Sequence, residues 1–272
     1  MRQGRSEQFL THRYRAGELA RAPDDLIVEE PMSIQLDGFE VATTMRTPGN
    51  DFELAAGFLH SEGLLGGASV QTVRYCATGS ALTTEYNVVT VETGGVAPIP
   101  TPRLQITNSS CGLCGSQTLE DLTARLNRYE GRDRFPLDVL VRCPELVRSE
   151  QALFAATGAV HGAALVGADG TVEVVREDIG RHNAVDKVVG RLLLDGRLPA
   201  EDSALFVSGR ASFEIVQKAW AGGFSAVVAV SAPSALAVDT ARAAGILLTG
   251  FTRDGSMNIY SPTNLQASPE IL

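Results

Sequence analysis

The pattern of apolar and polar residues predicts a β-hairpin and then a helix near the start of the chain. Apolar and polar residues alternate in 33–36 and 39–42, and Asp37-Gly38 joins the two segments. Asp-Gly is typical of a two-residue hairpin turn, because both turn positions need a positive φ angle. Asn50 or Asp51 is then predicted to cap a helix, since apolar residues recur at helical spacing after it.

The second half of the chain repeats the hairpin signal and adds longer apolar strands. Asp169-Gly170 separates the strand-like segments 160–166 and 171–176, and helical spacing marks 144–156 and 183–194 on either side. Three apolar strands follow, and two of them lead into helices with a serine at the predicted N-cap. They are 204–207 with Ser212, 226–230 with Ser234, and 246–249.

Apolar strands that alternate with helices are typical of a largely parallel sheet covered on both faces. We therefore predict an α/β fold, with a three-layer α/β/α core built on a mixed, mostly parallel sheet that has one antiparallel strand. A smaller α+β domain is predicted at 1–107, including a flexible arm at 1–25. A mobile cysteine loop is predicted at 108–116, and the α/β/α domain at 117–272.

Three loops follow the predicted parallel strands at their carboxyl ends, where open α/β sheets bind ligands. Two of them open helices, whose free N–H groups attract anions, and Arg210 and Arg253 could contact a phosphate. Each loop alone is compatible with an ordinary turn, but together they predict a nucleotide or dinucleotide site. Neither a Rossmann nor a P-loop motif is present. The loops are Ser208-Gly209-Arg210, Ser231-Ala232-Pro233-Ser234 and Gly250 to Ser256.

Composition narrows the class of partner and the compartment. The 272 residues have a formal net charge of -9 and a sequence pI of about 5.0, which argues against binding to a nucleic-acid backbone. The longest apolar run, 226–230, is too short to span a bilayer. The first residues show no signal-peptide pattern, and four cysteines are too few and too unevenly spaced for a disulfide-stapled secreted domain. We therefore expect a cytoplasmic protein without membrane insertion.

Two cysteines form the motif Cys111-Gly112-Leu113-Cys114, just before a predicted helix. The positive end of a helix favours thiolate over thiol, which lowers a cysteine pKa from its reference value of about 8.5. The glycines are expected to keep the loop pliable and open. An accessible thiolate is suited to sulfur relay, because it can take a sulfane sulfur from a donor persulfide while the second thiol assists its release.

Three other kinds of site use paired cysteines. A thioredoxin-type dithiol would lie in an N-terminal βαβ unit, and a structural zinc site would need a second pair of ligands. A zinc deaminase is the sharpest alternative, because His60-Ser61-Glu62 precedes the cysteine pair. However, Ser110 stands where that motif has proline, and His60 lies in the last turn of a predicted helix, where histidine needs no metal. We expect no structural metal.

The segment Arg176 to Lys187, between the second hairpin and the next helix, is rich in ionisable residues. It is compatible with a solvated helix cap, with Asp178 or Asn183 as the N-cap. It could also place acids and bases beside the ligand loops, and His182 is then the candidate for proton transfer, because histidine titrates near neutrality. His161 is as compatible with a packed core residue as with a functional one.

The motifs together resemble the FdhD family of formate dehydrogenase accessory proteins, over roughly 29–261. Each motif alone is weak, and the combination is specific. Ala159 departs slightly from the glycine-rich pattern of the family, which leaves the cysteine chemistry untouched. The matching segments are Arg46-Thr47-Pro48-Gly49, Ser110 to Gly115, Arg176 to Lys187, Ser208-Gly209-Arg210 through Gln217-Lys218, Ser231-Ala232-Pro233, and Gly250-Phe251 onward.

The resemblance implies a cytidine-deaminase-like domain without zinc, and a homodimer. It implies that Cys111 accepts persulfide sulfur from a cysteine desulfurase, with Cys114 as its partner. The sulfur would pass to the molybdenum cofactor (Mo-bis-guanine dinucleotide) of formate dehydrogenase, and GDP-like nucleotides would bind the same site. The implied cofactor loop is Phe251, Thr252, Arg253, Asp254, Gly255 and Ser256, and Ser208, Gly209, Arg210, Ser231 and His182 are predicted to contribute.

The alternative function is a molybdenum-cofactor chaperone whose thiols are incidental. The two functions differ in whether formate dehydrogenase still matures when both cysteines are lost. A zinc hydrolase or deaminase would instead require stoichiometric zinc.

Overall fold

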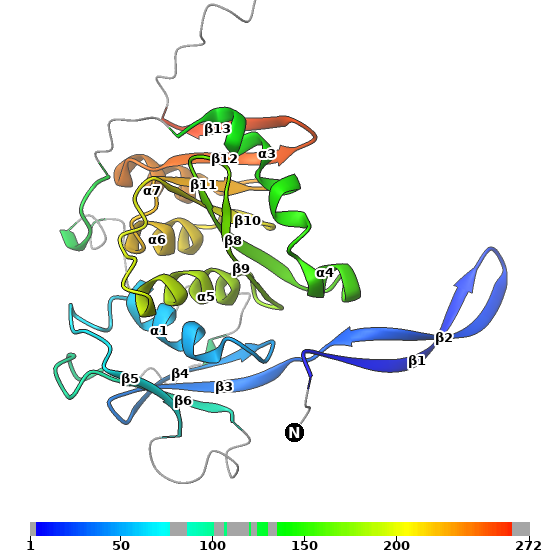
Figure 1. Ribbon diagram of the computed structural model, residues 1–272, viewed down its shortest axis with the longest axis horizontal. Coiled ribbons are helices and arrows are strands. Elements are labelled where there is room, and N and C mark those ends of the chain that lie inside the picture. Colours follow the sequence, from blue (N-terminus) through cyan, green and yellow to red (C-terminus); the bar gives the residue numbers. More distant parts are fainter. Residues whose placement is uncertain are drawn as a thin grey trace, which may run out of the picture.

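The computed structural model of this chain describes residues 4–76, 86–100, 106–107, 120, 124–129 and 135–262. Two β-sheets with their helices form the body, and a separate two-stranded hairpin projects from it (Figure 1). Within these ranges, no helix is long and apolar enough to cross a bilayer.

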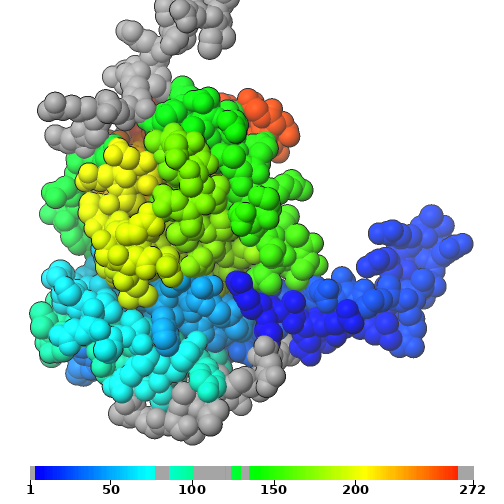
Figure 2. Space-filling view, viewed as in Figure 1, coloured from blue at the N-terminus to red at the C-terminus, as the bar shows by residue number. Residues whose placement is uncertain are grey.

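The projecting hairpin consists of β1 (Ser6–Arg15) and β2 (Glu18–Ile27), which pair antiparallel along their whole length. Ala16 and Gly17 form the turn, with φ angles of 48° and 92°. Most side chains of both strands are exposed, and the hairpin extends away from the body (Figure 2). Most of the arm predicted for 1–25 therefore has regular secondary structure, since residues 6–25 belong to this hairpin.

The N-terminal sheet has the strand order β5-β6-β3-β4-β7 and is covered by helix α1. The hairpin predicted at Asp37-Gly38 joins β3 to β4, and both turn residues have positive φ angles, 48° and 87°. Inward-facing residues of β3 and β6 pack with Leu54 and Leu59 of α1 in one apolar core. The elements are β3 (Glu30–Leu36), β4 (Phe39–Arg46), α1 (Asp51–Ser61), β5 (Thr72–Tyr75), β6 (Val88–Glu92) and β7 (Ile106–Thr107).

The second sheet has the order β13-β12-β11-β10-β8-β9. It is mixed, as predicted, but only β10, β11 and β12 pair in parallel, and the other three pairings are antiparallel. Two strands, β8 and β13, run against their neighbours where one was expected, so the sheet is not mostly parallel in its pairing. The strands are β8 (His161–Gly167), β9 (Val172–Asp178), β10 (Ser203–Val207), β11 (Ala226–Ala229), β12 (Leu247–Arg253) and β13 (Ser256–Ser261).

The extra antiparallel strand arises from the last Asp-Gly of the chain. Asp254 and Gly255, with φ angles of 50° and 71°, turn the chain back from β12 into β13. The predicted cofactor loop at 250–256 is therefore largely the end of one strand and the start of the next. The Asp-Gly signal that predicts the turns at 37–38 and 169–170 is therefore present at this hairpin as well.

Helices cover both faces of the second sheet. On one face lie α5 (Arg181–Leu194), α6 (Phe213–Ala221) and α7 (Ala235–Ala244), and on the other lies α3 (Leu137–Arg148), followed by α4 (Ala152–Thr157). Along β10, Leu205 and Val207 pack toward α5, α6 and α7, whereas Ala204 and Phe206 pack toward α3. Successive residues of a strand point to opposite faces, so the continuous apolar run of β10 is explained by burial on both sides.

Two predicted helix boundaries are wrong. The helix expected at 144–156 is two helices, α3 and α4, and Pro144 lies inside α3 rather than at its start. Val139, Leu140, Cys143 and Val147 give α3 a buried stripe that continues past the proline, because tertiary packing outweighs the lost backbone hydrogen bond.

The capping residues also differ in part from prediction. Gly180, not Asp178 or Asn183, is the N-cap of α5. The Ser234 hydroxyl caps α7, as predicted, by accepting the Ala237 N–H at 3.2 Å.

The two parts of the body meet where α1 crosses α5. A Cβ atom added to Gly57 of α1 would lie 1.9 Å from the carbonyl oxygen of Asp186. A Cβ atom added to Gly190 of α5 would lie 1.8 Å from the carbonyl oxygen of Glu53. The two helix backbones are therefore in direct contact, and only glycine fits at the crossing.

Gly190→Ala should destabilise the protein, although alanine normally favours a helix over glycine by about 1 kcal/mol. The added methyl group must push the two backbones apart, which costs about 1–3 kcal/mol or more. Urea unfolding followed by circular dichroism measures the change, with Arg191→Ala on the exposed side of the same helix as the control. A stabilised Gly190→Ala variant would show that the helices separate easily.

Candidate functional site

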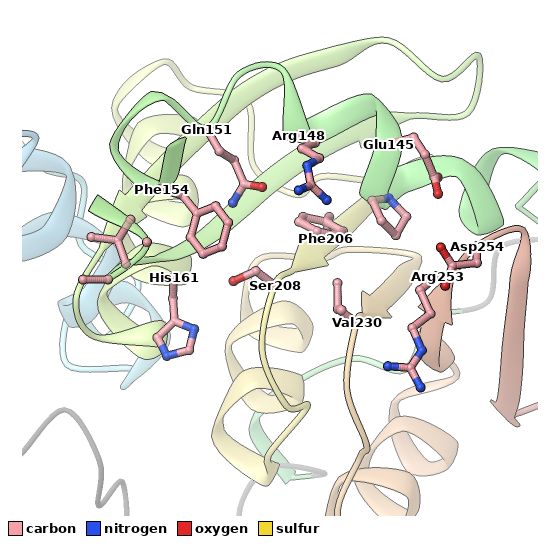
Figure 3. Close-up of a pocket in the computed structure, with 14 residues that line it drawn as sticks. Glu145, Arg148, Gln151, Phe154, His161, Phe206, Ser208, Val230, Arg253 and Asp254 are labelled. Carbon is pink, nitrogen blue, oxygen red and sulfur yellow. The ribbon is translucent and has the colours of Figure 1, made fainter. Parts of the chain in front are cut away.

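A cavity of about 530 Å³ lies where the parallel strands end, between them and the helices α3 and α4 (Figure 3). Phe206 and Val230 give it apolar walls from β10 and the end of β11. Arg148, His161 and Arg253 bring basic side chains to it from three different segments. Glu145 and Asp254 also line it, so the cavity holds two guanidinium groups and two carboxylates. An apolar cavity with a few convergent polar groups is typical of a site for a small molecule.

The three predicted loops do converge at this edge. The Ser231 N–H donates to the Gly209 carbonyl at 3.3 Å, and the Phe251 N–H donates to the Ser231 carbonyl at 3.2 Å. The packing is close, because a Cβ atom at Gly250 would lie 2.8 Å from Pro233. The ligand edge predicted from the strand order is therefore one continuous surface.

The predicted site residues divide into those that face the cavity and those that do not. Ser208, Arg253 and Asp254 line it. Thr252 points into the protein, where its hydroxyl lies 3.1 Å from that of Thr249. The remaining loop residues lie outside the lining. Arg210 and Phe251 are exposed, and Gly209 and Ser231 connect the loops. Gly255 belongs to the hairpin turn, and Ser256 begins β13.

Ser208 is oriented by the backbone of the adjacent strand. Its Oγ accepts the Gly162 N–H at 2.9 Å, across the β8–β10 pair. This bond fixes Ser208 at the edge of the cavity beside His161, the first residue of β8.

His161 is a member of the site whose role the sequence left open. It lines the cavity, and Gly209 packs against its ring, because a Cβ atom there would lie 3.4 Å from Nδ1. Burial lowers the His161 pKa, and the nearby charges of Arg181, His182 and Arg210 lower it further. At neutral pH the imidazole is therefore held in its neutral form, among cationic neighbours that suit an anion.

His182 lies in the first turn of α5 and does not line the cavity. Its Nε2 lies 3.2 Å from the Ser212 hydroxyl and 3.7 Å from a Glu214 carboxylate oxygen. The contact with His182 lowers the pKa of Glu214 to about 2. The side chain predicted to transfer protons thus connects α5 to the start of α6.

Most of the lining residues were not predicted from the sequence, and Arg148, Gln151 and Phe154 are among them. These three come from the end of α3 and from α4, whose boundaries were predicted wrongly. No motif marks them. The apolar spacing of Val139, Leu140, Cys143 and Val147 is the one signal available. It predicts a helix that ends near Arg148, with Arg148 on the exposed side.

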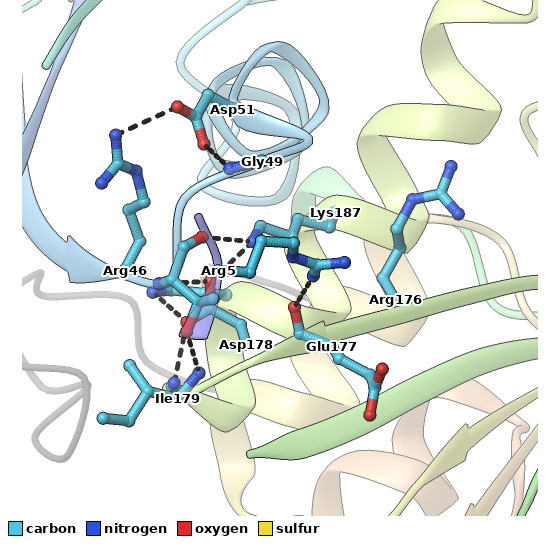
Figure 4. A network of polar contacts seen from close by, with 12 residues as sticks. Arg5, Arg46, Gly49, Asp51, Arg176, Glu177, Asp178, Ile179 and Lys187 are labelled. Carbon is cyan, nitrogen blue, oxygen red and sulfur yellow. Dashed lines mark hydrogen bonds and ion pairs between the residues drawn. The ribbon is translucent and has the colours of Figure 1, made fainter. Parts of the chain in front are cut away.

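The ionisable segment between β9 and α5 holds the two sheets together (Figure 4). Lys187 and Asp178 are fully buried, with Nζ 2.7 Å from Oδ2. Lys187 also donates to the Thr47 carbonyl at 3.0 Å, and Asp178 accepts the Thr47 N–H at 3.1 Å. Asp178 further accepts hydrogen bonds from the Gly180 N–H and the Asn183 side chain.

The buried pair therefore joins two of the sequence motifs, Arg46 to Gly49 and Arg176 to Lys187. Asn183 extends the connection by donating to the Met45 carbonyl at 2.8 Å. On the other side, Arg46 donates to Asp51 at 3.1 Å, at the start of α1. These residues position the sheets and do not line the cavity.

The histidine half of the possible zinc motif is also engaged in packing. Nε2 of His60 lies 2.9 Å from the Ala221 carbonyl oxygen, and Glu62 pairs with the buried Lys218 at 3.4 Å. In the described part of the chain, no group of three or more His, Cys, Asp or Glu side chains is placed to hold a metal.

The cysteine pair, Cys111 and Cys114, and the whole loop predicted at 108–116 lie outside the described residues. The other two cysteines, Cys76 and Cys143, are buried. Burial raises the pKa of the Cys143 thiol to about 12, so it stays protonated at neutral pH.

A family model and individual relatives of this chain both indicate the same protein family. Residues 27–265 match the model of the FdhD/NarQ family. The chain is 47% identical over 259 residues to the sulfur carrier protein FdhD of Streptomyces avermitilis, which covers 92% of this chain and 91% of that protein. It is 46% identical over 259 residues to the protein of the same name from Mycobacterium tuberculosis, covering 90% and 93%.

The fold has a solved counterpart. A crystal structure of a protein described as a formate dehydrogenase accessory protein, from Desulfotalea psychrophila, has a TM-score of 0.75 to this chain at 23% identity. The likeness covers 94% of this chain and 97% of that one, and it concerns the fold. From the family match over 27–265 and the identity to its named members, the chain belongs to the FdhD/NarQ family.

Proposed function

We propose that this chain is a sulfur carrier that accepts persulfide sulfur on Cys111 and delivers it during formate dehydrogenase maturation. The observation that carries the proposal is the identity of 47% across nearly the whole chain to a protein named for sulfur carriage. The chain also retains a cysteine pair of the kind that sulfur relay needs.

The other cysteines are poor candidates for the carrier. The Cys143 thiol is fully buried, donates to the Val139 carbonyl at 3.4 Å, and has a pKa raised to about 12. Cys76 is also buried. The nucleophile in sulfur exchange is the accessible thiolate, so Cys111 and Cys114 are the remaining choice.

Loading is an exchange at sulfur. The Cys111 thiolate attacks the terminal sulfur of a persulfide on a cysteine desulfurase. A new S–S bond forms on Cys111, the S–S bond of the donor breaks, and the donor cysteine leaves as a thiolate.

Delivery uses the second cysteine. The Cys114 thiolate attacks Sγ of Cys111, and the bond to the carried sulfur breaks. The sulfur leaves as sulfide with the electron pair, and Cys111 and Cys114 remain as a disulfide. A cellular dithiol then supplies two electrons and restores both thiols.

The acceptor in this proposal is the molybdenum cofactor with its guanine dinucleotides, treated as substrate. The cavity of about 530 Å³ is the size of a site for a drug-sized ligand, and so for one nucleotide arm. Arg253 and Arg148 are suited to the pyrophosphate, because guanidinium groups bind phosphate oxygens in pairs. Ser208 and His161 could hydrogen-bond the same ligand, and GDP-like nucleotides would compete for it.

Three further features belong to the proposal. The chain acts in the cytoplasm, where a cysteine desulfurase and formate dehydrogenase are its partners, and it acts as a homodimer. Its second sheet and helices correspond to a cytidine-deaminase-like domain that has lost the deaminase zinc. The helices on both faces of that sheet support this relation.

Cys111→Ala should abolish loading while the fold is kept. Purified protein is incubated with a cysteine desulfurase and cysteine, and intact-mass spectrometry measures the gain of one sulfur atom. Cys143→Ala is the matched control and should load normally, because its thiol is buried and protonated. Full loading of Cys111→Ala would contradict the proposal.

A further inference from the structure

We propose that the outer edge of β1 pairs antiparallel with β1 of a second copy of this chain, so that two projecting hairpins form one four-stranded sheet. The family match begins at residue 27, where β2 ends, so the hairpin lies outside the family core. The inference specifies a contact surface for the proposed homodimer and rests on that part of the proposed function. It is independent of sulfur transfer.

The hairpin has no core of its own. Leu10, Tyr14 and Leu19 are 60%, 70% and 67% exposed. Tyr14 and Leu19 are cross-strand partners in the ladder, and Leu10 lies on the same face because its position differs from that of Tyr14 by an even number. An isolated two-stranded hairpin is marginal in water, whereas four strands with a shared apolar face are stable.

Only one edge of the hairpin is open to pairing. Pro23 of β2 is the partner of Leu10 in the ladder. Proline has no N–H to give, so in a regular ladder its nitrogen lies on the outer edge of β2. That edge therefore lacks a donor at its centre, which is a common protection of edge strands. The sequence of β1 contains neither proline nor glycine, so its edge is complete.

The geometry of the ladder limits the register between two copies. Because Leu10 is opposite Pro23, the even-numbered residues of β1 point their N–H and C=O groups to the outer edge. Two antiparallel copies can then be related by a twofold axis at Thr11 or at Leu10. These registers place Glu7 opposite Arg15 or Arg13 of the second copy, respectively.

The charges of β1 suit such a pairing. Its acidic residue, Glu7, lies near one end, and Arg13 and Arg15 lie near the other. An antiparallel copy therefore brings opposite charges together at both ends of the seam, and each pair adds to the backbone hydrogen bonds. A twofold axis also merges the two apolar faces, because both copies present Leu10, Tyr14 and Leu19 on the same side of the sheet.

His12→Pro is the discriminating variant, because His12 has its N–H on the outer edge and the change leaves the ladder to β2 intact. Analytical ultracentrifugation of the full chain should show a dimer whose dissociation constant rises roughly tenfold or more. Arg21→Pro is the matched control, because Arg21 is the ladder partner of His12 on the opposite edge. It should leave the dimer unchanged.

A charge exchange tests the register without proline. Glu7→Arg should weaken the dimer, and adding Arg15→Glu or Arg13→Glu should restore it. A wild-type monomer would overturn both the homodimer and this inference. A dimer that neither His12→Pro nor Glu7→Arg weakens would overturn only the β1 seam, since the copies then associate elsewhere. Sulfur loading of His12→Pro stays normal in every case.

Discussion

Cells whose only copy of this chain carries Cys111→Ala should lose formate dehydrogenase activity almost completely. In the proposed function the Cys111 thiolate forms the new S–S bond, which alanine cannot form, so no sulfur would reach the acceptor cofactor. Buried Cys143 cannot substitute, because its thiol is protonated at neutral pH. Formate oxidation measured in extracts, with the chain quantified by immunoblot, tests the expectation.

A second variant separates sulfur carriage from cofactor binding. Arg253→Ala removes a cationic side chain from the cavity. It should load persulfide normally on Cys111 and still give low formate dehydrogenase activity, because the acceptor is held less well. If a variant that lacks both Cys111 and Cys114 supports normal activity, the cofactor chaperone becomes the better description and sulfur carriage is wrong.

Lys187→Met should cost about 3–5 kcal/mol of unfolding free energy, the largest loss of stability we expect from a single change. The substitution leaves the Asp178 carboxylate in a dry interior without its counter-charge, although three N–H donors remain around it. Burial lowers the pKa of Lys187 and Asp178 opposes that effect, so the charged pair persists only while both partners are present.

Urea unfolding measures the change through the single tryptophan of the chain. Trp220 lies in α6, and its indole N–H donates to the Asn127 carbonyl at 2.7 Å, so its fluorescence reports on the packed body. Arg197→Met is the matched control. It breaks an ion pair with Glu173 in which both side chains are more than a third exposed, and should cost no more than about 1 kcal/mol. Equal losses of unfolding free energy in Lys187→Met and Arg197→Met would show that the buried ion pair contributes no more to stability than the exposed one.

Local signals in the sequence predicted several of the turns and strands. The hairpins predicted at Asp37-Gly38 and Asp169-Gly170 are both present, because Asp-Gly favours a tight chain reversal. Both residues of the first pair have positive φ angles, whereas in the second pair only Gly170 has one. The last pair, Asp254-Gly255, lies in the predicted ligand loop and is a hairpin turn as well. Helix boundaries failed at α3, where a buried stripe continues past Pro144.

The convergence of the ligand loops was also predictable, because parallel strands place their carboxyl ends at one edge. The cavity itself was not. Arg148 and Phe154 reach it from helices on the opposite face, and nothing in their local sequence indicates which way those helices cross the sheet.

The sequence by itself determined two of the hairpins of the body, the alternation of strands and helices, and the edge where the ligand loops meet. Each of these depends on residues near one another in the chain. Only the tertiary structure decided the roles of Asp178, Lys187 and His182. Their chemistry suits catalysis or packing equally, and the partners that assign them to packing, such as Thr47 and Ser212, lie tens of residues away or more.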